Sequence, residues 1–333
     1  MPTRQYFGEI FLVINVPPQT EKRDMKFSPS LCAETPFPVV SIKCLLLQQL
    51  QEVIGNDSIE IPLQLTKDTT GRASAVTTPG ASRYISAIAL RLSPKWQGPP
   101  IEIARVIVSQ YQSQYPEFQN DFLMEVVPPG MILFEVRDRA LSSWLKNLSK
   151  TPLSLCQISP SSLISHPPSF HLSYTHARCC SLLRLAHRDR LITLKNPEPE
   201  ITPPLWELIT PNPIIWLNEQ GNLLFNHPTE RDLIYQLLAT LDTLIFSLYQ
   251  GQKEDFDGPN PPPLLRGGRG AIDLAYNLSK SWEQFYTECR IWGEVKRETP
   301  QKAQARLGLI IITHNFLRFL LQELLNFPLP LEL

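Results

Sequence analysis

Apolar positions in the first half of the chain recur in short segments. Residues 42–54 and 84–92 have the spacing of helices, whereas residues 59–65 alternate between apolar and polar positions as a strand does. Pro99 and Pro100 precede a further stretch with helical spacing, and proline is tolerated in the first turn of a helix. We therefore expect a domain that mixes helices and strands.

Two strands and a helix complete this expected domain. Residues 122–127 and 131–136 flank a Pro-Pro-Gly sequence at 128–130, a turn signal that predicts a hairpin. Residues 138–148 then have the pattern of a closing helix. This succession predicts an α/β module.

Prolines mark the boundaries of the expected parts. The 32 prolines among 333 residues are about twice the usual share of roughly 5%. Residues 151–170 combine proline and serine with few periodic apolar positions, which predicts an interdomain linker. We therefore divide the chain into a lead-in of uncertain structure at 1–40, the α/β module at 41–150, the linker, and a helical domain at 171–333.

Long amphipathic helices are expected beyond the linker. Apolar residues recur at helical spacing over 233–248, after Thr229, and Asp232 suggests a box-like cap at the start of this helix. A second apolar stripe covers 271–289 and follows a polar, proline-rich loop at 253–270. Both helices should bury one face against a neighbour.

The last expected helix, at 301–325, is apolar almost all round, which predicts the buried centre of a bundle. His314 lies in its middle, where we expect a hydrogen-bonded core histidine. A strand pair is expected around 214–225, with its turn at 219–222. The expected fold is thus an α/β N-terminal domain plus an all-α helix bundle, mainly α overall.

Charge and cysteine content limit the range of possible functions. A formal net charge of -1 gives no global field toward nucleic acid, so any RNA affinity must come from local basic patches. The six cysteines form no C-x-x-C pair, and adjacent Cys179 and Cys180 are poorly spaced for a disulfide framework or a zinc site. No apolar stretch reaches the roughly 18 residues of a membrane span. We expect a cytoplasmic protein without a metal, cofactor or membrane anchor.

Two segments of the helical part resemble arginyl-tRNA synthetases. The segment after the linker contains Tyr174, His176, Ala177 and Arg178 in the order found after that family's catalytic domain. The helix at 271–289 resembles the family's anticodon-binding helix, and the match continues into the last helix, as in the family's DALR anticodon-binding domain. Its signature residues here are Phe285, Tyr286, Cys289 and Arg290.

The first part is a weaker match. Residues 100–104 and 126–134 are similar to the family's N-terminal additional domain, which contacts the tRNA elbow in family members. The resemblance implies tRNA, or another structured RNA, as the partner.

The family's catalytic motifs are missing from the sequence. A class I synthetase needs a HIGH-type turn for ATP phosphates and a KMSK-type loop for the transferring phosphoryl charge. The nearest imitations are histidines at five-residue spacing over 166–176 and a glycine-rich stretch at 267–270 that lacks a P-loop lysine. The chain also ends Leu-Pro-Leu-Glu-Leu at 329–333, without the family's terminal methionine, which counts against selectivity for arginine tRNA. We expect no aminoacylation by this chain alone.

Candidate RNA contacts gather on two of the expected helices. If 174–191 is helical, Arg184 and Arg188 lie opposite its apolar side and could neutralise phosphates. A tyrosine and an arginine one turn apart on the 271–292 helix could present a shelf for an unpaired base. The candidate RNA-binding residues are Tyr174, His176, Arg178, Arg184, Arg188, Tyr286, Arg290 and Arg306.

Two other functions fit the same features. The helical domain could bind another protein instead of RNA, which would agree with the near-neutral charge and the proline-rich loop. The chain could also be a trans-acting tRNA-binding subunit that completes a separately encoded catalytic domain. Incidental charges on a solvated helix are the plainest alternative for the arginines.

Overall fold

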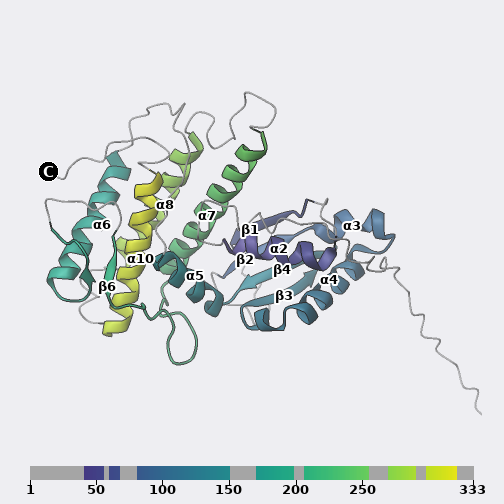
Figure 1. Ribbon diagram of the computed structural model, residues 1–333, viewed down its shortest axis with the longest axis horizontal. Helices are drawn as coiled ribbons and strands as arrows, with labels where there is room; N and C mark the ends of the chain where they lie inside the picture. Colours follow the sequence, from purple (N-terminus) through teal and green to yellow (C-terminus); the bar gives the residue numbers. More distant parts are fainter. Residues whose placement is uncertain are drawn as a thin grey trace, which may run out of the picture.

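The computed structural model describes most of the two expected parts. The expected lead-in, nearly all of the linker and most of the 253–270 loop lie outside the described residues. Figure 1 shows a sheet with covering helices beside a group of longer helices, which confirms the expected fold class. The described residues are 41–55, 60–67, 81–150, 170–198, 206–254, 269–289 and 298–320.

The first part is an antiparallel sheet with helices packed against it. The strand order is β1-β2-β4-β3, and α2 and α4 contact both each other and the sheet. Buried aromatic side chains such as Tyr84, Tyr111 and Phe134 fill the space between the layers. The elements are α2 (Ile42–Ile54), β1 (Leu63–Lys67), β2 (Ser82–Ser86), α3 (Ile88–Trp96), α4 (Pro100–Gln114), η1 (Pro116–Asn120), β3 (Phe122–Val127) and β4 (Met131–Val136).

The hairpin of β3 and β4 is confirmed. The two strands pair in register from Phe122 opposite Val136 to Val127 opposite Met131. Gly130 in the turn has a φ of +138°, and a Cβ there would lie 2.7 Å from the backbone of Pro100. Only glycine fits this position, because it combines the backbone conformation with the close approach of α4.

The expectation of one helix over 84–92 is wrong. Residues up to Ser86 form β2, and α3 begins only at Ile88. The side chain of Arg83 donates to Glu135 of β4 at 3.0 Å, and both residues are buried. Pairing with β4 therefore decides the conformation of this segment, although its local apolar spacing is helical.

The second part is a helix bundle centred on α10. Every residue from 305 to 314 of this helix is buried, which confirms the expected bundle centre. Figure 1 shows α10 beside α6 and α8, and it contacts both helices. Within the described ranges, no helix is long and apolar enough to cross a lipid bilayer. The helices are α6 (Phe170–Arg188), α7 (Pro228–Glu254), α8 (Arg269–Glu288) and α10 (Pro300–Phe319).

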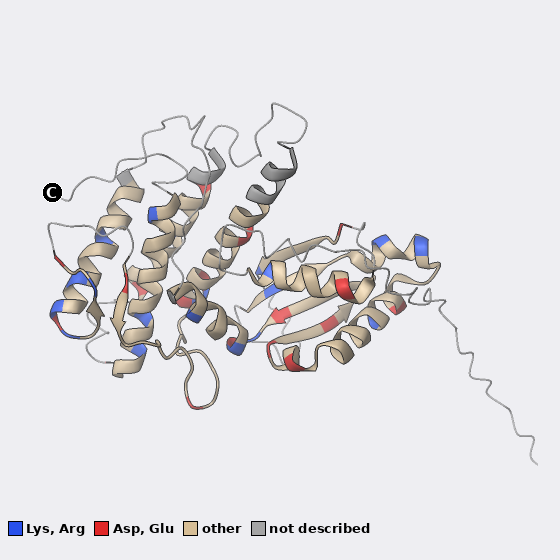
Figure 2. Cartoon of the chain, viewed as in Figure 1, with Lys and Arg blue, Asp and Glu red and all other residues tan. Residues whose placement is uncertain are grey.

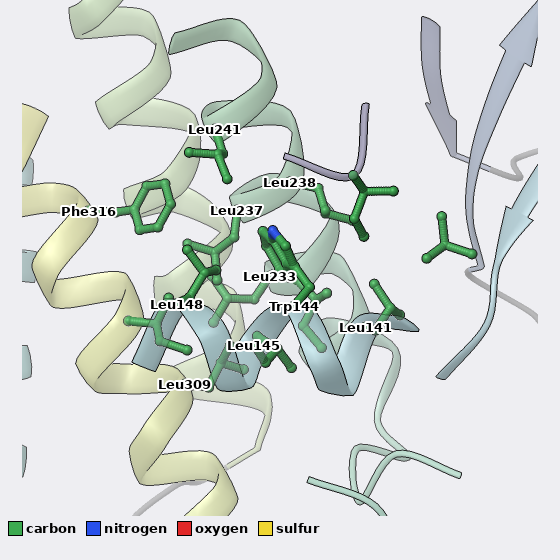
Figure 3. Packing of buried hydrophobic residues seen from close by; sticks show 14 of the residues in the cluster. Leu141, Trp144, Leu145, Leu148, Leu233, Leu237, Leu238, Leu241, Leu309 and Phe316 are labelled. Atoms are coloured by element: carbon green, nitrogen blue, oxygen red, sulfur yellow. The ribbon is translucent and has the colours of Figure 1, made fainter. Parts of the chain in front are cut away.

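Helix α5 (Asp138–Lys150) follows the sheet in the chain but packs into the bundle. Figure 3 shows its apolar side chains interleaved with those of α7 and α10. All of them are at least nine-tenths buried. The side chains in this layer include Leu141, Trp144, Leu145 and Leu148 of α5, Leu233, Leu237, Leu238 and Leu241 of α7, and Leu309 and Phe316 of α10.

The start of α7 differs from the expected cap. The backbone N–H of His227 donates to the carboxylate of Glu230 at 2.8 Å, so Glu230 supplies the capping carboxylate. Asp232 instead pairs with Lys67 of β1, with 2.6 Å between nitrogen and oxygen. A cap expected from local sequence has thus been replaced by a contact between the two parts.

The strand pair expected around 214–225 is reduced to one bridge between Leu217 and Leu223. The side-chain oxygen of Asn218 accepts from the backbone N–H groups of Gln220 and Asn222, both at 3.0 Å. These hydrogen bonds hold the backbone of the turn that the bridge encloses. A short sheet that the pattern did not predict forms nearby from β5 (Thr193–Leu194) and β6 (Leu208–Thr210).

Polar contacts also join the sheet to the bundle. The hydroxyls of Ser41 and Tyr84 donate to the buried carboxylate of Asp242 in α7, at 2.5 and 2.8 Å. Burial raises the pKa of Asp242 to about 6, although these two hydrogen bonds favour the ionised form. Arg231 of α7 pairs with Asp138 at the start of α5. The two parts are therefore held by hydrogen bonds as well as by the apolar layer.

Candidate nucleic-acid interface

Helices α6 and α8 run side by side in the same direction. Their contact contains a buried hydrogen bond of 2.6 Å between the hydroxyls of Thr175 and Ser279. Nearer the start of both helices, the rings of His171 and Tyr276 lie 5.5 Å apart. The guanidinium of Arg178 meets Tyr286 toward the other end. We call the exposed residues along this contact, Tyr174, Arg178, Tyr276 and half-buried Tyr286, the α6–α8 seam.

Three side chains form a stack at the seam. The rings of Trp282 and Tyr286 are nearly parallel, 9° apart, with centroids separated by 5.3 Å. The guanidinium carbon of Arg178 lies 5.0 Å from the centroid of the Tyr286 ring, and an Arg178 N–H donates to the Tyr286 hydroxyl. Trp282 is buried, so it fixes the plane of the tyrosine ring from below.

Arg178 keeps its charge in this arrangement. The hydrogen bond with Tyr286 raises the pKa of Arg178, so the guanidinium stays protonated. A phenol does not neutralise it, and no carboxylate of the described residues forms an ion pair with it. An exposed cation held in place by a neutral ring can bind a phosphate oxygen.

The seam also exposes two large aromatic side chains. Tyr174 lies one turn before Arg178 on α6, and 47% of its surface is exposed, as is 47% of Tyr276 on α8. Figure 2 shows arginines recurring along α6. Exposed rings beside cations are the combination that unpaired bases and their phosphates need.

The structure brings three of the expected RNA contacts together: Tyr174, Arg178 and Tyr286. Arg188 is exposed at the end of α6. Arg290, expected to share a shelf with Tyr286, lies outside the described residues. The guanidinium that meets Tyr286 belongs instead to Arg178, which local spacing could not reveal because 108 positions separate the two residues.

Arg184 was expected on the solvent-exposed side of α6, opposite its apolar side, but the structure places it elsewhere. It is half-buried, and its guanidinium lies over the indole of Trp206 at 5.7 Å from the ring centroid. Trp206 is brought there from the segment before β6. The buried side of α6 is as expected, because Cys179 and Leu183 are fully covered.

His176 is buried, and its ring packs against that of His314 with centroids 4.6 Å apart and planes tilted by 33°. Burial, followed by the charges of Arg318 and Arg184, lowers the pKa of His176 to about 4. The ring is therefore neutral near pH 7 and lies inside the bundle. His176 is therefore not part of the candidate interface.

Arg306 is likewise inside the bundle, with 2% of its surface exposed. Its guanidinium pairs with Glu230 at 2.5 Å and with Glu298 at 2.9 Å. Glu230 is fully buried, so its carboxylate needs this cation. Arg306 thus joins α10 to the start of α7 and is not part of the exposed seam.

The expectation for His314 is confirmed, because it is fully buried and accepts a hydrogen bond from the indole N–H of Trp206 at 3.2 Å. The expectation that the cysteines lack ligand spacing missed one arrangement. Cys180 lies one turn after His176, and both side chains meet His314, with ligand atoms within 4.8 Å of one another. The spacing from His176 to Cys180 was visible in the sequence, but the third residue comes from a distant helix.

Part of the chain is similar in sequence to known proteins. No protein-family model and no solved structure matches it. It is 29% identical over 163 residues to an arginine–tRNA ligase of Synechococcus sp. (strain JA-3-3Ab), covering 49% of this chain and 22% of that protein. It is 30% identical over 151 residues to the arginine–tRNA ligase of Gloeobacter violaceus, covering 45% of this chain and 20% of that protein. The matched region therefore spans about a fifth of the length of these relatives. Over this region the chain is a distant relative of arginine–tRNA ligases.

Proposed function

We propose that this chain is a tRNA-binding, non-catalytic relative of arginyl-tRNA synthetases, and that its helix bundle is a DALR-type anticodon-binding domain. The observation that carries the proposal is the stack of Arg178, Tyr286 and Trp282 at the α6–α8 seam. The relationship to arginine–tRNA ligases supports RNA as the partner of the chain in general.

The stack supplies two kinds of RNA contact. Its guanidinium can pair with a phosphate, which gives sequence-independent and salt-sensitive affinity. The exposed tyrosine rings beside it can stack on unpaired bases, a contact of about 1–3 kcal/mol per base. Because the net charge of the chain is only -1, the attraction to RNA has to come from local arrangements of this kind.

The proposal is tested by filter binding of the full chain to total tRNA and to arginine tRNA at two salt concentrations. Arg178→Ala should weaken binding about 5- to 30-fold and reduce the dependence of log K on log salt by about one unit. Lys195→Ala is the control, because Lys195 is an exposed cation of the bundle part that pairs with Glu207 and lies outside the α6–α8 seam. Aminoacylation measured in parallel should be absent.

Tyr286→Ala should weaken binding with little change in the salt dependence, because it removes the ring and hydroxyl that hold the Arg178 guanidinium in place but leaves the charge itself. Parental affinity in both Arg178→Ala and Tyr286→Ala would exclude the seam as the RNA contact. No tRNA binding by the parent at low salt would exclude the proposed function and favour a protein partner for the bundle.

A further inference from the structure

Three potential metal ligands meet inside the bundle, away from the α6–α8 seam. His176 and Cys180 lie on α6 and His314 on α10, and each is buried. Their ligand atoms lie within 4.8 Å of one another. A cluster of two imidazoles and one thiol is a ligand set that transition metals use in proteins.

The tautomer of His314 directs a lone pair into this cluster. The side-chain oxygen of Asn315 accepts from the backbone N–H of Trp206 at 3.3 Å, which fixes the orientation of the amide. The same oxygen lies 3.2 Å from His314 Nδ1, so Nδ1 carries the proton. His314 Nε2 is then the acceptor, and it lies 3.3 Å from Cys180 Sγ. Metal-binding histidines are held in this way, with one nitrogen donating to a protein oxygen and the other ligating.

His176 has a nitrogen without a hydrogen-bond partner. Its Nε2 is buried and makes no hydrogen bond to any of the described residues. A buried polar atom of this kind costs about 1–3 kcal/mol when it stays unsatisfied. A metal ion bound by His176, Cys180 and His314 would satisfy it.

Charge and ligand number indicate which ion fits. The guanidinium groups of Arg184 and Arg318 are close enough to both histidines to influence their protonation. A buried dication beside two arginines would be strongly disfavoured. Cu(I) carries one charge, prefers thiolate and imidazole ligands, and forms a neutral unit with one thiolate. Three ligands match its low coordination number.

We infer that His176, Cys180 and His314 form a binding site for one Cu(I) ion. Binding forms a bond from copper to the Cys180 sulfur, and the thiol proton leaves to solvent. His314 Nε2 exchanges its hydrogen bond with the Trp206 indole for the metal. No electron is transferred, because copper enters and stays as Cu(I).

The test is an anaerobic titration of the full chain with Cu(I) in competition with bicinchoninate, a coloured Cu(I) chelator. The parent should take one equivalent of copper from the chelator. Cys180→Ser should weaken this binding about 100-fold, on the scale at which changes around metal sites act. Cys179→Ser is the matched control, because Cys179 is the adjacent buried cysteine on the same helix. It should bind copper as the parent does.

Copper-edge X-ray absorption on the loaded parent should show two imidazole nitrogens and one sulfur around the metal. This measurement tests the copper site on the parent protein alone if circular dichroism shows that Cys180→Ser does not fold. The inference is overturned if the parent takes up no copper, if Cys179→Ser loses binding equally, if folded Cys180→Ser binds as the parent does, or if the metal is bound by sulfur alone.

Discussion

The arginines of the bundle have two different surroundings. Arg178 lies at the surface against a tyrosine ring, whereas Arg306 is buried between two carboxylates. The sequence predicts both as RNA contacts because residue type and family resemblance do not reveal partners. Glu230 lies 76 positions from Arg306, so only the fold brings the two charges together.

Arg306→Met should lower the free energy of unfolding by about 3–5 kcal/mol, because it leaves the buried carboxylate of Glu230 without its cation. Urea unfolding followed by circular dichroism measures this loss. Lys302→Ala is the control, since Lys302 pairs with Glu298 in a more exposed position and should cost about 1 kcal/mol or less. Parental stability of Arg306→Met together with weaker tRNA binding would restore Arg306 to the interface.

At the scale of elements, regular spacing predicts the long helices and the β3–β4 hairpin well. Where the expectation fails, a long-range contact has decided the conformation. Residues 84–86 become a strand because β4 pairs with them, and the carboxylate of Asp232 binds Lys67 and does not cap α7. In the candidate interface, the sequence predicts α6 and α8 as the helices involved, but not the pairing of Arg178 with Tyr286.

Close packing of α10 explains a glycine inside this helix. A Cβ at Gly308 would lie 2.6 Å from Ile214 Cδ1 and 2.8 Å from the Trp216 ring. Alanine favours a helix over glycine by about 1 kcal/mol. The clash should outweigh this gain, so Gly308→Ala is expected to lower the free energy of unfolding by about 1–3 kcal/mol.

Thermal and urea unfolding of Gly308→Ala measure the sign of this effect. Adding Ile214→Val removes the closest atom, Cδ1, and should recover part of the loss. A stabilised Gly308→Ala would mean that the 214–216 segment moves away from α10 at little cost.

At the scale of the whole molecule, the sheet and the bundle are joined through α5 and through Asp242. The division into domains at 41–150 and 171–333 follows the proline pattern, but pattern alone gives no indication that α5 packs into the bundle. Its apolar positions predict a buried face without identifying what covers it. Likewise, no local signal pairs Asp242 with Ser41, which lies 201 positions away.

The stability that Asp242 contributes at the contact between the sheet and the bundle should depend on pH. The pKa of Asp242 is raised from 3.8 to about 6 in the folded state, so the folded protein holds this proton more tightly than the unfolded chain does. Its contribution to stability is therefore present below about pH 4 and lost as the pH rises through about 6, on the order of 3 kcal/mol. Asp242→Asn should remove this loss.

The measurement is the difference in unfolding free energy between the parent and Asp242→Asn from pH 4 to 7. Because His176 has a lowered pKa, its own contribution rises with pH over the same range, but it is shared by both proteins and cancels in the difference. A difference that stays constant with pH would contradict the raised pKa of Asp242.

The hydroxyl of Ser41 makes two hydrogen bonds where the sheet meets the bundle. It donates to Asp242 of α7, and it accepts from the backbone N–H of Cys44 as the N-cap of α2. Separating the bundle from the sheet would therefore free this oxygen from α7 and loosen the first turn of α2. Hydrogen exchange at the Cys44 amide then becomes a reporter of docking, which senses the position of α7 from a helix on the other side of the joint.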